Sequence, residues 1–279
     1  MRPLLTFVLA LALLGVASPP RIVAIVPSLA DDLFAIGAGA QVVGVSRFVD
    51  DVAAAKNVPV VADFQSVDVE KIVALHPDVV VGIPSQAAMV AGLRRAGIRV
   101  VLVPDDSYDD IFTDLRTLGD VSGRRTEAGA LIARLQRETA QLRAQTRRFA
   151  YRPSVFFALG TGPIWTVGRG SYLATLVAFA GGRNAAADLT TPWGQYSEEA
   201  LVRAQPDAII AGHDTPIASV LDRDPWRSLR AVREKHVFTP EDARIDDALY
   251  RPGPNYNEGL RWLIERLSPL STSKTPSAR

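Results

Sequence analysis

Apolar and polar positions alternate on two scales along the first part of the chain. Short apolar runs, at residues 22–26 and 79–81, are typical of strands buried on both faces. Other segments, such as residues 107–118, carry apolar residues every three or four positions, which is typical of amphipathic helices. Strands that alternate with helices predict a parallel or mostly parallel sheet with helices on both faces. We therefore expect an N-terminal α/β lobe over residues 19–122.

The same alternation begins again after residue 150. A predicted strand over residues 154–159 is followed by a glycine-rich loop and by a helix that starts at Ser171. The last predicted helix, over residues 256–267, has one apolar face. We expect a C-terminal α/β lobe over residues 151–270 and a polar, disordered tail over residues 271–279.

Local signals refine both lobes. Ser28 and Asp31 match a capping box for the first helix. Residues 217–221 and 226–234 predict two further helices, and residues 239–255 predict a long loop before the last helix.

One long helix is predicted between the lobes, over residues 123–150. Its apolar residues recur at spacings of three, four and seven, and its interior holds no proline. Periodicity alone favours an ordinary core helix, but the matching lobes on its two sides favour a connecting role. The predicted fold is α/β, with two Rossmann-like lobes joined by a single long α-helix and a ligand cleft between the lobes.

The two lobes share a sequence motif. Residues 67–82 and 196–212 each contain a helix-capping residue, a glutamate two positions later and a Pro-Asp pair before an apolar strand. Glu70 and Glu199 are 129 positions apart, as are the two prolines, and an internal duplication explains this better than chance does. Each glutamate suits the first turn of a helix, but its repetition suggests a two-point acidic contact with a basic partner.

Composition and charge exclude several classes of function. The 279 residues include 31 basic and 30 acidic side chains, and a net charge of +1 argues against binding to nucleic acid or to an anionic membrane. Cysteine is absent, so we expect no disulfide, no thiolate metal site and no bacterial lipoprotein acylation.

Residues 1–18 have the form of a secretory signal peptide. Arg2 precedes an apolar run over residues 4–16, and the small residues Ala17 and Ser18 follow it. The run is shorter than the roughly 20 residues that a membrane-spanning helix needs, which favours cleavage. Retention of the segment as an anchor is the alternative. We expect an exported, soluble monomer.

Aromatic residues gather in loops predicted at the carboxyl ends of strands, where α/β proteins usually bind ligands. Each could instead pack onto the core, but four on one rim predict an apolar cleft. These residues are Phe48, Phe64, Trp165 and Trp193. The polar residues predicted near the same edge, each of which could simply be solvated, are Ser46, Arg47, Asp50, His213, Asp242 and Arg251.

Catalytic and metal-binding hypotheses lack their usual motifs. The chain has no Gly-x-Ser-x-Gly elbow, and its three histidines do not cluster with carboxylates as a zinc or manganese site would require. The glycine-rich loop lacks the Lys-Ser/Thr of a phosphate-binding loop. A secreted hydrolase that uses Asp50, His213 or Asp242 is kept as an alternative.

Four segments of the chain together resemble one known family. They are Arg-Ile-Val-Ala-Ile-Val-Pro-Ser at residues 21–28, Val-Glu-Lys-Ile-Val-Ala-Leu-His-Pro-Asp at residues 69–78, Tyr-Ser-Glu-Glu at residues 196–199 and Arg-Pro-Gly-Pro at residues 251–254. In combination they resemble the iron-siderophore and vitamin B12 family of periplasmic substrate-binding proteins, which serve ABC importers. Within that family the chain is most similar to the B12-binding branch.

The resemblance implies a periplasmic protein, without catalysis or a resident cofactor, that captures a cobalamin-type corrinoid and delivers it to an ABC importer. It implies that Glu70 and Glu199 dock onto the permease of that importer. The ligand-binding residues that it implies are Phe48, Phe64, Ile83, Trp165, Trp193, Asp242 and Arg251.

The chain departs from the branch in the first lobe. Phe48 and Phe64 stand where the branch has a tyrosine and a tryptophan, and Ile83 stands where a second tryptophan is expected. These changes keep apolar area but remove hydrogen-bonding groups, so the ligand stays open. A ferric siderophore or haem is the alternative, and His213 or Tyr250 could then bind haem iron.

Overall fold

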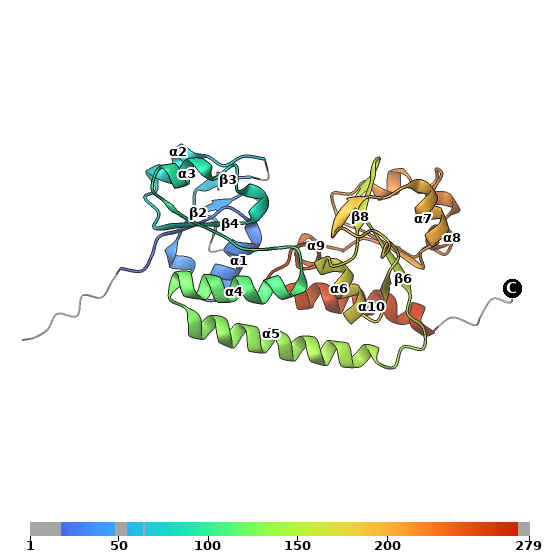
Figure 1. Cartoon of the computed structure of the whole chain (residues 1–279). Coiled ribbons are helices and arrows are strands. Elements are labelled where there is room, and N and C mark those ends of the chain that lie inside the picture. The colour runs from blue at the N-terminus through green and yellow to red at the C-terminus, as the bar shows by residue number, and fades with distance from the viewer. Residues whose placement is uncertain (1–17, 48–54, 64, 273–279) are drawn as a thin grey trace, which may run out of the picture.

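The computed structural model describes residues 18–47, 55–63 and 65–272, which form two α/β lobes on a layer of helices (Figure 1). The N-terminal lobe contains a five-stranded sheet of order β3-β2-β1-β4-β5, and all neighbouring strands are parallel, as predicted. Its strands are β1 (Ile22–Ala24), β2 (Val42–Ser46), β3 (Val60–Ala62), β4 (Val79–Gly82) and β5 (Arg99–Leu102).

Helices cover both faces of this sheet because successive side chains of a strand point to opposite faces. Ile22 and Ala24 of β1 face α1 and α4, whereas Val23 faces α2 and α3. These helices are α1 (Pro27–Ala35), α2 (Val69–Ala74), α3 (Ala91–Arg95) and α4 (Tyr108–Ser122), with short 3-10 helices η1 (Gly39–Gln41) and η3 (Pro84–Gln86).

The C-terminal lobe contains two sheets. A parallel sheet of order β12-β11-β6-β9 comprises β6 (Ser154–Ala158), β9 (Arg183–Asn184), β11 (Ala208–Ala211) and β12 (Val237–Phe238). An antiparallel sheet of order β10-β8-β7 comprises β7 (Gly160–Thr161), β8 (Ile164–Val167) and β10 (Trp193–Gln195). The expectation of a loop after residue 159 is therefore wrong, because Ile164 and Val167 are buried and fix a strand.

The helices of this lobe correct two further expectations. Residues 226–234 do not form one helix, because the backbone of buried Leu229 is extended and separates η5 from α8. Residues 239–255 are not a loop throughout, because Asp242 caps a helix there, α9. The elements are α6 (Tyr172–Phe179), α7 (Glu198–Ala204), η4 (Ile217–Ser219), η5 (Trp226–Ser228), α8 (Arg230–Arg233), α9 (Ala243–Tyr250) and α10 (Tyr256–Thr272).

Two helix ends also differ from the sequence predictions. The capping box of Ser28 and Asp31 is wrong, because α1 begins at Pro27, where proline suits the first helical position, and its N-cap Val26 has no side-chain hydrogen bond. The last helix, α10, continues past residue 267 to Thr272, because Leu270 and Ser271 are buried. The first residues of the expected tail thus belong to this helix.

The two parallel sheets have matching topology. When β1 is aligned with β6, the order β2-β1-β4-β5 corresponds strand by strand to β9-β6-β11-β12. Helix α2 directly precedes β4, and α7 directly precedes β11. The fold therefore agrees with the internal duplication inferred from the sequence.

The long helix α5 (Arg125–Thr146) lies along one side of both lobes and packs against α4 and α10 (Figure 1). It follows α4 after Gly123, whose φ of 72° ends that helix, and its 22 residues span about 33 Å. The predicted long helix is present, with slightly shorter ends. Within the described ranges, no helix combines the length and apolarity needed to cross a membrane.

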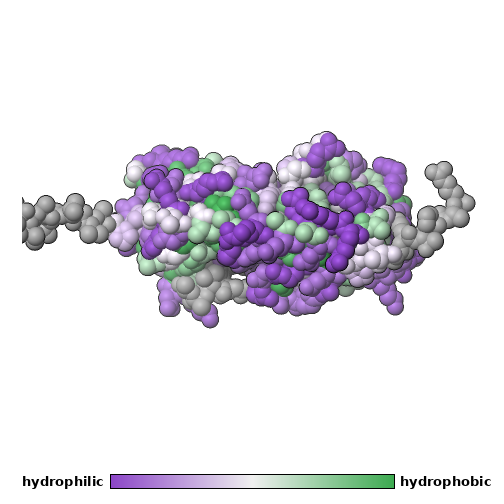
Figure 2. All heavy atoms as spheres, turned by 90° about the horizontal axis from the view of Figure 1, so that it is seen from below, coloured by the Kyte–Doolittle hydropathy of each residue, from purple (hydrophilic) through white to green (hydrophobic). Residues whose placement is uncertain are grey.

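One apolar core runs from β1 and α1 through α4, α5 and α10 to β6 and α6. Polar side chains also join α4, α5 and α10. The Thr139 hydroxyl of α5 lies 2.6 Å from the Tyr256 hydroxyl of α10, which lies 3.1 Å from the Tyr108 hydroxyl of α4. The Asn257 amide donates to the Leu135 carbonyl at 3.1 Å. The outer side of the layer is largely hydrophilic (Figure 2).

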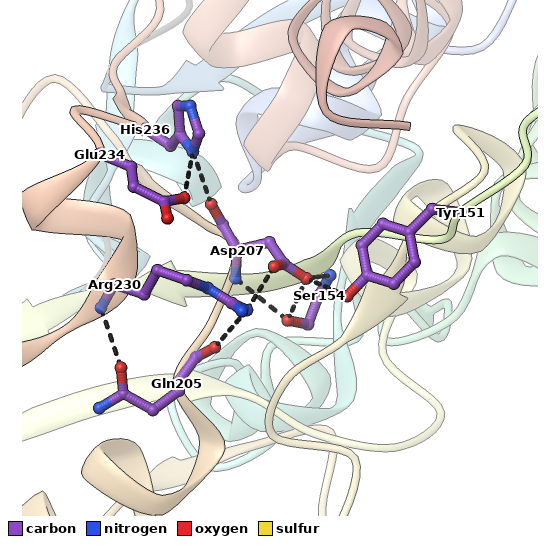
Figure 3. A network of polar contacts seen from close by, with 7 residues as sticks. All are labelled: Tyr151, Ser154, Gln205, Asp207, Arg230, Glu234 and His236. Carbon is purple, nitrogen blue, oxygen red and sulfur yellow. Dashed lines mark hydrogen bonds and ion pairs between the residues drawn. The ribbon is translucent and has the colours of Figure 1, made fainter. Parts of the chain in front are cut away.

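The Pro-Asp pairs of the duplicated motif hold the amino ends of the sheets together. Asp207 accepts hydrogen bonds from the Ser154 backbone at 2.8 Å and from the Tyr151 hydroxyl at 2.7 Å, and it forms an ion pair with Arg230 (Figure 3). Asp78 accepts from the Arg21 backbone at 2.7 Å in the same way. Each aspartate thus ties its own strand to the neighbouring central strand.

Electrostatics agree with this role of Asp207. Burial alone would raise the pKa of its carboxyl group. The hydrogen bonds from Ser154 and Tyr151 and the charge of Arg230 outweigh burial and lower that pKa, so the carboxylate stays ionised at neutral pH.

Two other aspartates are buried without such support. Asp32 of α1 and Asp114 of α4 are almost inaccessible, and each has a carboxyl oxygen without a hydrogen-bond partner in the described structure. Burial, with the charges of Asp110 and Asp105, raises the pKa of Asp114 to about 8. Burial and then Asp114 raise the pKa of Asp32. The interface between α1 and α4 therefore contains neutral carboxyl groups at neutral pH.

We expect Asp114→Asn to stabilise the protein at pH 8 by about 2 kcal/mol and to have little effect near pH 4. The ordinary aspartate pKa of about 3.9 applies to the unfolded chain, so the folded chain holds the extra proton between that pH and about 8, and stability falls as pH rises through this window. Urea unfolding at several pH values measures the effect. Asp109→Asn, on the exposed side of α4, is the control, and an equal effect of Asp114→Asn at every pH would contradict the assignment.

Candidate ligand-binding site

Trp165 and Trp193 lie on one face of the antiparallel sheet. Trp193 of β10 stands opposite Val167 of β8, and Trp165 is two positions from Val167. Residues opposite each other in an antiparallel pair point to the same face, and so do residues two apart. The two indoles therefore share a face, and Trp165 is 41% exposed, which is unusual for so large an apolar side chain.

Trp193 also links the lobes. Its indole Nε1 donates to the Asp106 carboxylate at 3.3 Å, and Asp106 lies between β5 and α4. The backbone carbonyl of Asp106 also accepts a hydrogen bond from the backbone N–H of Tyr172 at 2.8 Å. Trp193 is thus fixed at the junction of the lobes, whereas Trp165 is partly exposed in the part of the chain that the structure describes. The sequence predicted Trp193 as a site residue but not its hydrogen bond to Asp106.

Ile83 follows β4 at the carboxyl edge of the N-terminal sheet. Its backbone N–H donates to the Gln86 side chain at 3.3 Å, and that amide donates to the Ile25 carbonyl at 3.2 Å. Buried Gln86 therefore shapes this edge. Its role is not visible in the sequence, because it depends on the contact with β1.

Asp242 and Arg251 are placed at the two ends of α9. Asp242 caps the helix by accepting from the Ile245 backbone at 2.9 Å. Arg251 ends the helix and forms an ion pair with Asp247 at 2.9 Å. Both side chains thus stabilise the ends of α9 through local contacts. Predicted site residues Phe48 and Phe64, and also Asp50, lie outside the described residues.

The Tyr250 ring lies beside Gly212, and His213 follows it, near the carboxyl end of β11. The His213 backbone donates to Asp246 at 3.0 Å. The Tyr250 hydroxyl is buried and has no hydrogen-bond partner in the part of the chain that the structure describes. Burial, and then the charge of Asp246, raises its pKa well above the ordinary value, so the phenol keeps its proton. Across the described ranges no three histidine or acidic side chains could hold a metal ion.

Glu70 and Glu199 are both exposed, on α2 and α7. The caps of these helices are Asp68, which accepts from the Lys71 backbone at 2.9 Å, and Ser197, which accepts from the Ala200 backbone at 3.1 Å. Backbone and Ser197 hydrogen bonds lower the pKa of Glu199. The two carboxylates therefore occupy equivalent exposed positions, one in each lobe.

Comparisons with known proteins agree with this architecture. Residues 22–243 match the protein family described as periplasmic binding protein. The vitamin B12-binding protein of Pectobacterium atrosepticum is 30% identical over 262 residues, which cover 91% of this chain and 90% of that protein. The ABC transporter substrate-binding lipoprotein YvrC of Bacillus subtilis is 29% identical over 259 residues, which cover 90% and 81%. The periplasmic haem-binding protein RhuT of Roseiflexus sp. RS-1, in its apo form, has a TM-score of 0.80 and 25% identity, covering 91% of this chain and all of that one.

We expect Trp165→Phe to remove most of the tryptophan emission that iodide quenches. Trp226 and Trp262 are only 2% and 4% exposed, and Trp193 is partly buried, so Trp165 is the indole most accessible to a dissolved ion. Stern–Volmer titration measures this, with Trp193→Phe as the comparison. A quenching curve unchanged by Trp165→Phe would show that this indole is covered.

Proposed function

Because the chain belongs to the periplasmic binding protein family, we propose that it captures a cobalamin-type corrinoid and delivers it to an ABC importer. The observation that carries the proposal is the shared face of Trp165 and Trp193 beside the junction of the lobes. Aromatic side chains suit a large, flat ligand because they bury extensive apolar area with few rotatable bonds. The B12-binding relative supports the same ligand class.

The family consists of substrate-binding proteins of transport systems rather than enzymes. The prediction of a protein without catalysis is confirmed by this membership, and the secreted hydrolase is set aside. Asp242, one of the residues considered for hydrolysis, is a helix cap.

In this proposal the corrinoid contacts Trp165, Trp193 and Ile83. Phe48 and Phe64 complete the apolar surface in the first lobe, and the resemblance alone supports them. Asp242 and Arg251 stabilise the two ends of α9, and the resemblance supports their place in the ligand site.

Haem is the second candidate, because the Tyr250 hydroxyl is buried without a partner and RhuT is a haem-binding protein of the same fold. A tyrosine binds ferric iron best as a phenolate. Burial raises the pKa of Tyr250, which opposes ionisation, and the hydroxyl is shielded from solvent. The corrinoid is therefore the better-supported ligand.

Titration of the purified protein with cyanocobalamin should quench tryptophan emission with a stoichiometry of one, and Trp165→Phe should weaken both the quenching and the affinity. Hemin and a ferric hydroxamate are titrated in parallel. No response to cyanocobalamin together with saturable binding of either competitor would replace the corrinoid with that ligand.

Family membership and the importer-linked relative support an exported location, either periplasmic or membrane-anchored. We favour a periplasmic monomer, because residues 1–18 resemble a cleavable signal and the chain has no cysteine for acylation. The partner proposed for Glu70 and Glu199 is the importer's permease.

Glu70→Arg and Glu199→Arg should each weaken binding to a B12-importing permease–ATPase complex by at least about tenfold, because each places like charge against a basic partner. The affinity for cyanocobalamin should not change, since both residues are exposed on the outer helices. Glu265→Arg, exposed on α10, is the control. A loss of cyanocobalamin affinity in either variant would place the glutamates in the ligand site or the fold instead.

A further inference from the structure

Four large apolar side chains are exposed among the described residues, at Val60, Val73, Trp165 and Val202. A single exposed valine is ordinary. Val73 and Val202, however, occupy the same position of the duplicated motif, because they are separated by the same 129 positions as Glu70 and Glu199. Their exposed fractions, 38% and 37%, are also nearly equal.

Each valine lies beside the glutamate of its own helix. Val73 follows Glu70 by three residues on α2, and Val202 follows Glu199 by three residues on α7, so each pair shares one helix face. The preceding residue in each helix, Ile72 or Leu201, is fully buried against its sheet. The two helices are thus rotated alike, with an acid and a valine outward.

Both pairs are held rigidly by duplicated contacts. Asp68 and Ser197 cap the amino ends of the helices. After each helix the chain turns at a residue in the left-handed region, His76 (φ 46°) or Gln205 (φ 37°), and enters the Pro-Asp pair that is tied to the central strand. A surface fixed at both ends loses little entropy when it binds.

The two pairs also lie on comparable faces of the molecule. The apolar cores under α2 and α7 are on the faces of the two parallel sheets opposite the shared core that contains α5. Figure 1 shows both helices on the side of the molecule away from α5. One partner can therefore reach both pairs at once.

We propose that Glu70 with Val73 and Glu199 with Val202 form two equivalent contacts, in which each valine fills an apolar hollow beside a basic side chain of a two-fold-symmetric partner. The proposal rests on the docking to an importer proposed above and adds to it the apolar half of each contact. The carboxylates provide charge complementarity, and the matching pairs require the partner to offer the same patch twice, as a symmetric dimer does. Burial of each valine excludes water from the adjacent ion pair, which strengthens it.

Val73→Ser and Val202→Ser test the proposal in the full chain loaded with cyanocobalamin. Each should weaken binding to a purified B12-importing permease–ATPase complex in nanodiscs by about threefold to tenfold, from loss of buried apolar area, and the double variant should lose about the product. Cyanocobalamin affinity and thermal stability should not change. Val60→Ser is the matched control, because Val60 is as exposed but lies outside the duplicated motif.

The outcomes separate this inference from the proposed function. Wild-type binding by both serine variants, while Glu70→Arg and Glu199→Arg lose binding, overturns the apolar contacts and leaves the importer proposal intact. An effect at one valine only overturns the two-fold equivalence, and an equal loss in Val60→Ser overturns the role of the motif. Failure of the wild-type chain to bind the complex overturns the importer proposal and this inference with it.

Discussion

The two lobes of this protein share one apolar core, and every functional surface described above depends on it. The core passes through α4, α5 and α10, so the lobes cannot separate widely without exposing buried side chains. Hydrogen bonds between the hydroxyls of Thr139, Tyr256 and Tyr108 fix how α5, α10 and α4 are oriented against one another. We therefore expect ligand binding to move the lobes slightly rather than to close a wide hinge, and the outer helices α2 and α7 to keep a nearly constant separation.

Polar groups are used differently at the two edges of the sheets. At the amino edges, Asp78 and Asp207 satisfy backbone groups of adjacent strands. At the carboxyl edge of the second sheet, α9 places Asp246 and Tyr250, whose pKa values are raised by burial. In the interior, Asp32 and Asp114 each have an unsatisfied carboxyl oxygen, which lowers stability, whereas the apolar residues around them in α1 and α4 are buried in the shared core.

The sequence predicted those features that local patterns encode. Continuous apolar runs located the central strands, and apolar residues spaced three and four apart located α5. The repeated Glu and Pro-Asp positions indicated the duplication, and the matching strand orders of the two parallel sheets agree with it. The features it missed depend on contacts between distant segments. The strand β8 is fixed by burial, and the bond between Trp193 and Asp106 joins residues 87 positions apart. Helix α9 was also missed, although its cap, Asp242, is a local signal. The ligand-binding role of Asp242 and Arg251 stays a prediction, and their contacts at the ends of α9 could not be predicted from a segment expected to be a loop. Phe48 and Phe64 stay predictions.

The antiparallel sheet of β7, β8 and β10 makes the two halves of the molecule unequal. The described part of the N-terminal lobe has no counterpart to it, although the parallel sheets and the outer helices match. The two halves therefore match at the outer helices and differ where the C-terminal lobe adds this sheet. In the proposed docking, a symmetric partner requires both outer helices to stay alike, whereas an asymmetric ligand sets no such requirement on the segments that face it. A change of ligand would then need mutations in one half only and would leave the proposed docking surface unchanged.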